Sequence, residues 1–180
     1  MLDESHISLQ RARGRGRLHF GCKEDRTVLR DLHQSGCLKL MLPRNHHPVP
    51  DAVMINTAGG LTGGDRLDLD IGLDAGAKLR VATQTAERIY KSTGDTAHVK
   101  LRFDLDAQAA LDWLAQETIL FDGGRVDRSI EVDMDASASL LLVEPIVLGR
   151  LAMGETVHSG LLHDHWRVKR AGKLCFADET

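Results

Sequence analysis

The sequence predicts an all-β fold, a stack of β-hairpins or a β-helix-like architecture with very few helices. A phrase of the form D-A-x-A-x-L occurs three times, at residues 74–79, 106–111 and 135–140. Apolar residues alternate with polar ones on both sides of each phrase, with the period of a strand. Helical periodicity is nearly absent between the phrases. Together these observations predict repeated strand–turn–strand units that bury one continuous apolar face.

The D-A-x-A-x-L phrase itself predicts the turn of each unit. An Asp side chain can accept hydrogen bonds from backbone amides two residues on, and Ala and Gly keep the corner small. A sandwich built from similar hairpins is an alternative that these units leave open. The alternating apolar residues are Leu67, Leu69, Ile71, Leu73, Leu79 and Val81 in the first unit, Val99, Leu101, Phe103, Leu105, Leu111 and Trp113 in the second, and Ile130, Val132, Met134, Leu140 and Leu142 in the third.

The two ends of the chain carry weaker signals. Residues 1–16 are basic and polar, which predicts a flexible N-terminal arm before a strand around Leu18 and Phe20. Residues 17–180 then form a single β domain, and a further strand begins within 172–178. One short helical turn is expected within 144–155, where two glycines weaken it.

Composition excludes several classes of function. The 180 residues are 42% hydrophobic with a net charge of −3, so one core is expected and no nucleic-acid footprint stands out. No apolar run has the length of a membrane span, and the first residues lack the pattern of a secretory signal, so we expect a cytoplasmic protein with no membrane partner. The three cysteines have no spacing typical of a disulfide framework or a zinc site.

The glycine-rich stretch 56–66, NTAGGLTGGDR, looks at first like a phosphate-binding loop. A Walker loop needs Lys and Ser or Thr after its last glycine, and here Asp65 follows Gly64. A dinucleotide fingerprint must open a helix, and here an alternating strand follows. We therefore expect a structural turn, in which Gly59, Gly60, Gly63 and Gly64 supply positive φ or close backbone approach.

Two residue pairs suggest chemistry. Glu117 and Asp122 could act as the paired carboxylates of a β-stack hydrolase, or Glu117 could cap a strand while Asp122 starts a turn. His163 and His165 lie on one face of a strand, where two imidazoles can share a metal ion, although a solvated strand face is the more common meaning of this spacing. Neither pair by itself defines a site.

Four stretches interrupt the strand pattern with polar residues, and in this order they resemble one family, the urease accessory protein UreD, also called UreH. They are NTAGGLTGGDRL at 56–67, TQTAERIYKS at 83–92, LAQETILFDGGRV at 114–126 and GRLAMGE at 149–155. The resemblance runs from about Leu18 to Asp178. Members of the family are usually longer, so we expect this chain to be truncated at its C-terminus.

The resemblance implies a non-enzymatic metallochaperone scaffold with an all-β fold. Such a protein acts with the accessory proteins UreF and UreG, docks on apo-urease and helps to insert nickel into it. UreG is the GTPase of this set, so a Walker motif is not expected here. Nickel(II) would be held only transiently, with no tightly bound cofactor.

The resemblance also implies a passage for nickel through the protein, and acidic residues within the four stretches are its predicted path. These residues are Asp65, Glu117, Asp122 and Glu155. Thr83 and Thr85 are predicted as neutral lining, and Arg88 and Tyr90 as packing or partner contacts. For Asp65 the alternative is a turn that closes the glycine loop. A plain binding module, without any link to metal, is a third class that stays open beside the scaffold and the hydrolase.

Overall fold

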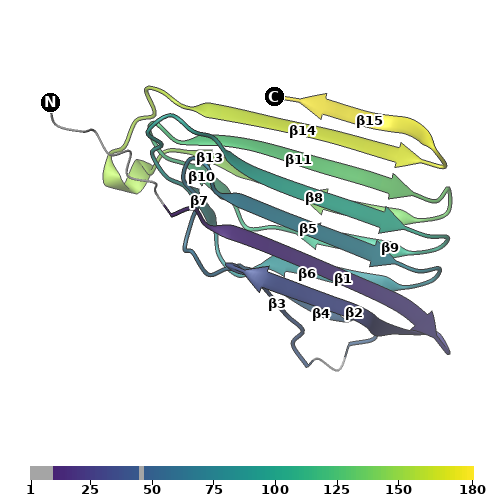
Figure 1. Cartoon of the computed structure of the whole chain (residues 1–180). Coiled ribbons are helices and arrows are strands. Elements are labelled where there is room, and N and C mark those ends of the chain that lie inside the picture. Colours follow the sequence, from purple (N-terminus) through teal and green to yellow (C-terminus); the bar gives the residue numbers. More distant parts are fainter. Residues whose placement is uncertain (1–9, 45–46) are drawn as a thin grey trace, which may run out of the picture.

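The computed structural model describes residues 10–44 and 47–180, and these residues form three β-sheets (Figure 1). The large sheet has seven strands, the second sheet five and the short sheet three. In spatial order the large sheet comprises β15 (Lys173–Glu179), β14 (Leu161–Arg170), β11 (Arg125–Met134), β8 (Ala97–Leu105), β5 (Arg66–Leu73), β1 (Arg13–Lys23) and β2 (Arg26–Gly36). The second sheet comprises β12 (Ser139–Val143), β9 (Ala110–Leu114), β6 (Lys78–Thr83), β4 (Asp51–Asn56) and β3 (Leu38–Met41), and the short sheet β13 (Ile146–Leu148), β10 (Thr118–Leu120) and β7 (Glu87–Ile89).

The chain winds through the three sheets as successive coils. It passes from the large sheet to the second sheet and then to the short sheet, as in β5, β6 and β7, before it returns to the large sheet at β8. The next coils repeat this path with β8, β9 and β10 and with β11, β12 and β13. Equivalent strands of neighbouring coils pair in parallel, for example β5 with β8 and β6 with β9. The all-β, β-helix-like prediction is therefore confirmed, and the strands of one repeat unit belong to different sheets.

The D-A-x-A-x-L phrases form the corners between the large and the second sheet. The amide of Ala77 donates to the carbonyl of Asp74 at 3.0 Å, and the later corners repeat this bond. Neighbouring corners are also joined to each other, since the amide of Gly76 donates to the carbonyl of Ala107 at 2.9 Å. Gly76 has a φ of 74°, the left-handed conformation that glycine adopts at little cost. The corners thus stack in register with the strands.

The core lies between the sheets and contains the alternating apolar residues that the sequence indicated. Leu69, Ile71 and Phe103 of the large sheet are fully buried against Leu111 and Trp113 of the second. The rings of Phe103 and Trp113 lie 5.2 Å apart between centroids. Burial of each such side chain stabilises the fold by about 1.5–3 kcal/mol.

The predicted N-terminal arm, residues 1–16, overlaps the first strand. Residues 1–9 lie outside the described part, but β1 already begins at Arg13, so residues 13–16 are not a loose arm. Gly14 and Gly16 point inward and are buried, whereas the arginines beside them point outward. A Cβ on Gly14 would lie 2.7 Å from the Cβ of Leu38, so only glycine allows β1 to pack this closely on β3. The Arg-Gly alternation is a strand pattern in which glycine takes the place of the apolar residue.

Helical structure in the described residues is limited to one 3-10 turn, Leu151–Met153, within the segment where a short helical turn was expected. The described residues include no helix that is long and apolar enough to span a membrane. Two antiparallel hairpins, β1–β2 and β14–β15, lie at opposite ends of the large sheet, drawn in purple and in yellow-green to yellow in Figure 1. The predicted last strand is β15.

Candidate functional site

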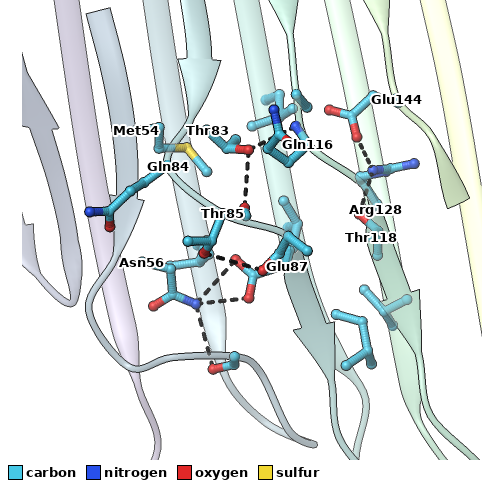
Figure 2. Close-up of a pocket in the computed structure, with 18 of the residues that line it drawn as sticks. Met54, Asn56, Thr83, Gln84, Thr85, Glu87, Gln116, Thr118, Arg128 and Glu144 are labelled. Atoms are coloured by element: carbon cyan, nitrogen blue, oxygen red, sulfur yellow. Dashed lines mark hydrogen bonds and ion pairs between the residues drawn. The ribbon is translucent and has the colours of Figure 1, made fainter. Parts of the chain in front are cut away.

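A cavity of about 60 Å³ opens into the interior between the three sheets (Figure 2). At about 10–15 Å³ for each water centre, this volume holds on the order of four waters. Leu67, Leu101 and Trp113 supply part of its apolar wall. Its polar wall comprises Asn56, Thr83, Gln84, Thr85, Glu87, Gln116, Thr118, Arg128 and Glu144. A cavity of this size with several polar partners suits ordered water or a hydrated ion.

Glu87 is the central carboxylate of this cavity (Figure 2). It begins β7, and the side-chain amide of Asn56 donates to its two carboxylate oxygens at 3.1 and 3.2 Å. Burial is the main cause that raises the pKa of Glu87 to about 7, against the lowering effect of the Asn56 hydrogen bond. The group therefore exchanges a proton near neutral pH, which also makes it able to exchange a proton for a cation.

A buried ion-pair network adjoins the cavity around Arg128. The guanidinium makes two hydrogen bonds to Asp164, at 2.9 and 2.6 Å, and a third to Thr118 at 3.3 Å. It also donates to Glu144, whose other oxygen accepts from the indole N–H of Trp113 at 2.6 Å.

The charges of this network hold one another in place. Burial raises the pKa of Glu144, although Arg128 and Trp113 act against this. For Arg128, burial lowers the pKa, but the hydrogen bonds and charges of Asp164 and Glu144 outweigh it and the pKa is raised. Loss of one partner would leave an unpaired buried charge, at a cost of about 3–5 kcal/mol.

The polar interior groups form a row along the axis of the coils. Asn56 comes from the first coil, Glu87 from the second, Thr118 from the third, Arg128 from the fourth and Asp164 from the fifth. Thr118 lies at the register position of Glu87, and Asp164 at that of Arg128. Because paired strands lie about 4.8 Å apart, the row extends for about 20 Å. We name these five residues the axial row.

Thr83 and Thr85, predicted as passage lining, lie in the cavity wall. The Thr83 hydroxyl donates to the carbonyl of Thr85 at 3.2 Å and accepts from the amide of Gln116 at 2.9 Å. The two threonines therefore occupy the place that a lining role needs, and that role itself stays a prediction.

The four predicted path carboxylates do not form one cluster, and two of them, Asp122 and Glu155, lie together. Asp65 is buried, and its two oxygens accept from the amides of Ala12 at 2.7 Å and Thr62 at 2.8 Å. This geometry favours the alternative in which Asp65 closes the glycine loop. Glu117 precedes β10, directly between the cavity residues Gln116 and Thr118. It is the predicted carboxylate whose sequence neighbours line the cavity.

Asp122 and Glu155 lie together beyond the other end of β10. The amides of His158 and Ser159 donate to Asp122 at 2.8 and 3.0 Å, and these bonds lower its pKa. Glu155 accepts from Arg150 at 2.8 Å, which lowers the pKa of Glu155. β10 separates Glu117 from Asp122 by about 10 Å of strand, so the geometry does not support a paired-carboxylate hydrolase.

The glycine loop packs on β7 and the residues after it. Gly59, Gly60 and Gly64 have φ values of 76°, 148° and 86°. A Cβ on Gly63 would lie 2.2 Å from the hydroxyl of Ser92. Arg88 and Tyr90 both donate to the carbonyl of Gly59, at 3.4 and 3.2 Å, so both side chains contact this loop.

Comparisons with known proteins agree with the resemblance seen in the four polar stretches. A sequence model of the family described as UreD urease accessory protein matches residues 12–180. The chain belongs to the UreD family.

Curated relatives named urease accessory protein UreD include one from Chelativorans sp. (strain BNC1), 51% identical over 99% of this chain and 64% of its own length. Another, from Rhizobium leguminosarum bv. trifolii (strain WSM2304), is 50% identical over 94% of this chain and 62% of its own length. A relative from Dinoroseobacter shibae (strain DSM 16493 / NCIMB 14021 / DFL 12) is 50% identical over 92% of this chain and 59% of its length. The chain thus spans less than two thirds of the length of these UreD relatives.

The sequence-based predictions missed the charged members of the site in this UreD family chain. Arg128 interrupts an apolar face of β11 on which Val126, Ile130 and Val132 are buried. Asp164 likewise points inward from β14, between outward histidines. A charged residue at an inward position of an alternating strand is the signal that could have found both.

Proposed function

We propose that this chain is a non-catalytic scaffold of urease maturation in the cytoplasm. It assembles with UreF, UreG and apo-urease and passes nickel(II) toward the urease active site through the interior of its coils. The relatives' name, urease accessory protein UreD, supports the link to urease. The axial row is the observation that carries the nickel role.

The chemistry of nickel fits the cavity and its carboxylates. Nickel(II) accepts carboxylate, imidazole and water ligands. A protein that passes the ion on must hold it weakly, and a cavity with room for several waters lets the ion keep much of its hydration shell. Glu87 offers one carboxylate there, while the threonine hydroxyls and amide side chains offer neutral oxygens. No closed cage of ligands surrounds this position among the described residues.

Arg128 limits how tightly the interior can hold a cation. Glu87, Glu144 and Asp164 would together attract a divalent ion strongly, but Arg128 pairs with two of them. The guanidinium also adds a repulsive charge, and both effects favour release. We propose Glu87 as the transient nickel ligand, Thr83 and Thr85 as lining, and Glu117 as the predicted path carboxylate next to the cavity. In this proposal Asp122 and Glu155 are further carboxylates of the nickel path, whereas Asp65 closes the glycine loop.

The test is nickel loading of urease in a reconstituted system. The chain is co-produced with UreF, UreG and apo-urease from the same source, and the nickel content and activity of urease are measured after pull-down of the complex. We expect Glu87→Gln to leave the complex intact and to lower urease nickel about tenfold, on the scale of the 10–100-fold that metal-site partners contribute. Glu131→Gln, the same change on the outside of β11, is the matched control.

Several outcomes would contradict parts of this proposal. Full metallation with Glu87→Gln removes this carboxylate from the path. A complex that assembles but does not change the nickel content of urease favours a purely structural role. A folded chain that does not assemble with the other proteins contradicts the scaffold role itself. The same assay with a longer UreD relative separates loss of a docking surface from a wrong function.

A further inference from the structure

A second group of metal-ligating side chains lies outside the interior, on the outer face of the large sheet. His98, Asp127 and His163 occupy one register row across the adjacent strands β8, β11 and β14. His165 follows two residues along β14, on the same face, and Glu179 lies opposite it on β15. Four neighbouring strands thus bring three imidazoles and two carboxylates together.

Distances within this group are short. Asp127 Oδ1 lies 3.0 Å from His163 Nδ1 and 3.9 Å from His165 Nδ1, and Asp127 Oδ2 lies 3.4 Å from His98 Nδ1. One ligand atom each from Asp127, His163 and His165 can be chosen so that all lie within 4.8 Å of one another. Ligands at about 2.0–2.2 Å from one tetrahedral ion are about 3.4 Å apart, so small side-chain rotations suffice.

One buried ring nitrogen of the group lacks a hydrogen-bond partner, and a second ring lies between two carboxylates. His165 Nδ1 is buried and has no hydrogen-bond partner among the described residues, since Asp127 lies beyond hydrogen-bond range. His163 lies between two carboxylates, with Asp127 at 3.0 Å from Nδ1 and Glu179 at 3.2 Å from Nε2. A protonated imidazole donates to both, whereas a neutral one that donates Nε2–H to Glu179 turns the lone pair of Nδ1 toward Asp127. A cation near Asp127 would satisfy both histidines.

We propose that Asp127, His163 and His165 bind a divalent first-row transition metal ion on the outer face of the large sheet. His98 offers a third nitrogen, and so a fourth ligand, close to Asp127. Glu179 accepts the Nε2–H of His163 and so turns Nδ1 toward the ion, as outer carboxylates do for metal-binding histidines. Imidazole and carboxylate donors select zinc, nickel, cobalt or copper over magnesium and calcium. This site is separate from the axial row and does not depend on the proposed function.

The experiment is a metal titration of the purified chain, produced without a histidine tag. Zn²⁺, Ni²⁺ and Mg²⁺ are titrated by calorimetry, and Co²⁺ by its visible absorption, which reports coordination by nitrogen. We expect one transition-metal ion bound per chain at this site and no competition by Mg²⁺. The double variant His163→Gln, His165→Gln should weaken this binding at least about 100-fold, and Glu179→Gln about 10-fold.

Matched variants separate this site from other sources of binding. His19→Gln removes an imidazole that pairs with Asp74 at 2.6 Å but belongs to no group of three metal-ligating side chains among the described residues, and should leave affinity unchanged. Glu131→Gln, on the same outer face of β11 but outside the group, should also leave it unchanged. Equal affinity in the double variant and the parent chain, with matching circular dichroism, would overturn the proposal. So would loss of binding in Glu131→Gln alone, because the ion would then lie elsewhere on this face.

Discussion

The carboxylate of Glu87 lies where a negative charge is costly, and the Asn56 side-chain amide, the backbone amide of Arg88 and the charge of Arg88 offset only part of that cost. A pKa near 7 means that the folded protein retains a proton that the unfolded chain, with an ordinary glutamate, has already released. Between the unfolded value of 4.5 and about 7, the folded state therefore binds more protons than the unfolded state.

The titration of Glu87 should make the free energy of unfolding depend on pH. The contribution of protonated Glu87 is fully present below pH 4.5 and is lost as the pH rises through about 7, so the free energy of unfolding should decrease over this window. The full effect is on the order of 3 kcal/mol. Urea denaturation at intervals from pH 5 to pH 8 measures it. Glu87→Gln should remove most of this slope and be the more stable protein at pH 8, and an unchanged slope would assign the titration to another group.

At the scale of the element, β1 shows why a strand can escape notice. Its inward positions are Gly14, Gly16, Leu18 and Phe20, and only the last two are apolar side chains that periodicity detects. The repeated strands β5, β8 and β11 were predictable because their inward positions are mostly Leu, Ile, Val and Phe. Their parallel pairing between coils was not, since a strand–turn–strand unit has the same local pattern as a hairpin and as a coil corner.

The candidate site was also predictable only in part, because local sequence patterns do not show which strands become neighbours. Thr83 and Thr85 stand out as polar residues at the end of β6, but Glu87, Arg128 and Asp164 are single charged residues whose meaning depends on which strands become neighbours. Arg128 and Asp164 are 36 residues apart and meet only because β11 and β14 pair in register. A sequence alone does not specify that pairing.

The packing of β1 gives a test with an internal control. Gly14→Ala would place a Cβ 2.7 Å from Leu38, so we expect the free energy of unfolding to fall by about 1–3 kcal/mol. In Gly72→Ala on β5, the new Cβ would meet the ring of His19 at 3.6 Å, an ordinary contact, and we expect a change within about 0.5 kcal/mol. The denaturant midpoints of both variants measure these changes. Equal losses of stability would mean that the close approach of β1 to Leu38 is not the reason why Gly14 is needed.

At the scale of the whole molecule, two sheets end in strands that carry exposed apolar side chains. β12 and β13 are the terminal strands of the second and short sheets, and their exposed residues include Leu141, Val143, Val147 and Leu148. Unpaired edges with apolar side chains promote association between chains. The isolated chain should therefore self-associate.

Lysine substitutions at this edge test the expectation. Leu141→Lys combined with Val147→Lys should shift the isolated chain toward a monomer, because a charge on an edge strand opposes pairing with another chain. Analytical ultracentrifugation across a concentration series measures the change. Leu29→Lys, at an exposed leucine beside Arg30 and Asp31 on β2, is the control and should have little effect. Self-association that persists in the double variant would place the contact elsewhere.

The axial row has a further consequence for biogenesis. Each coil supplies one member, so no partly folded intermediate contains the whole row, and a chain with one misplaced coil has a gap in it. If nickel moves along this row, transport competence and complete folding are the same condition. Copies with a missing or misplaced coil would then not pass nickel on through the interior.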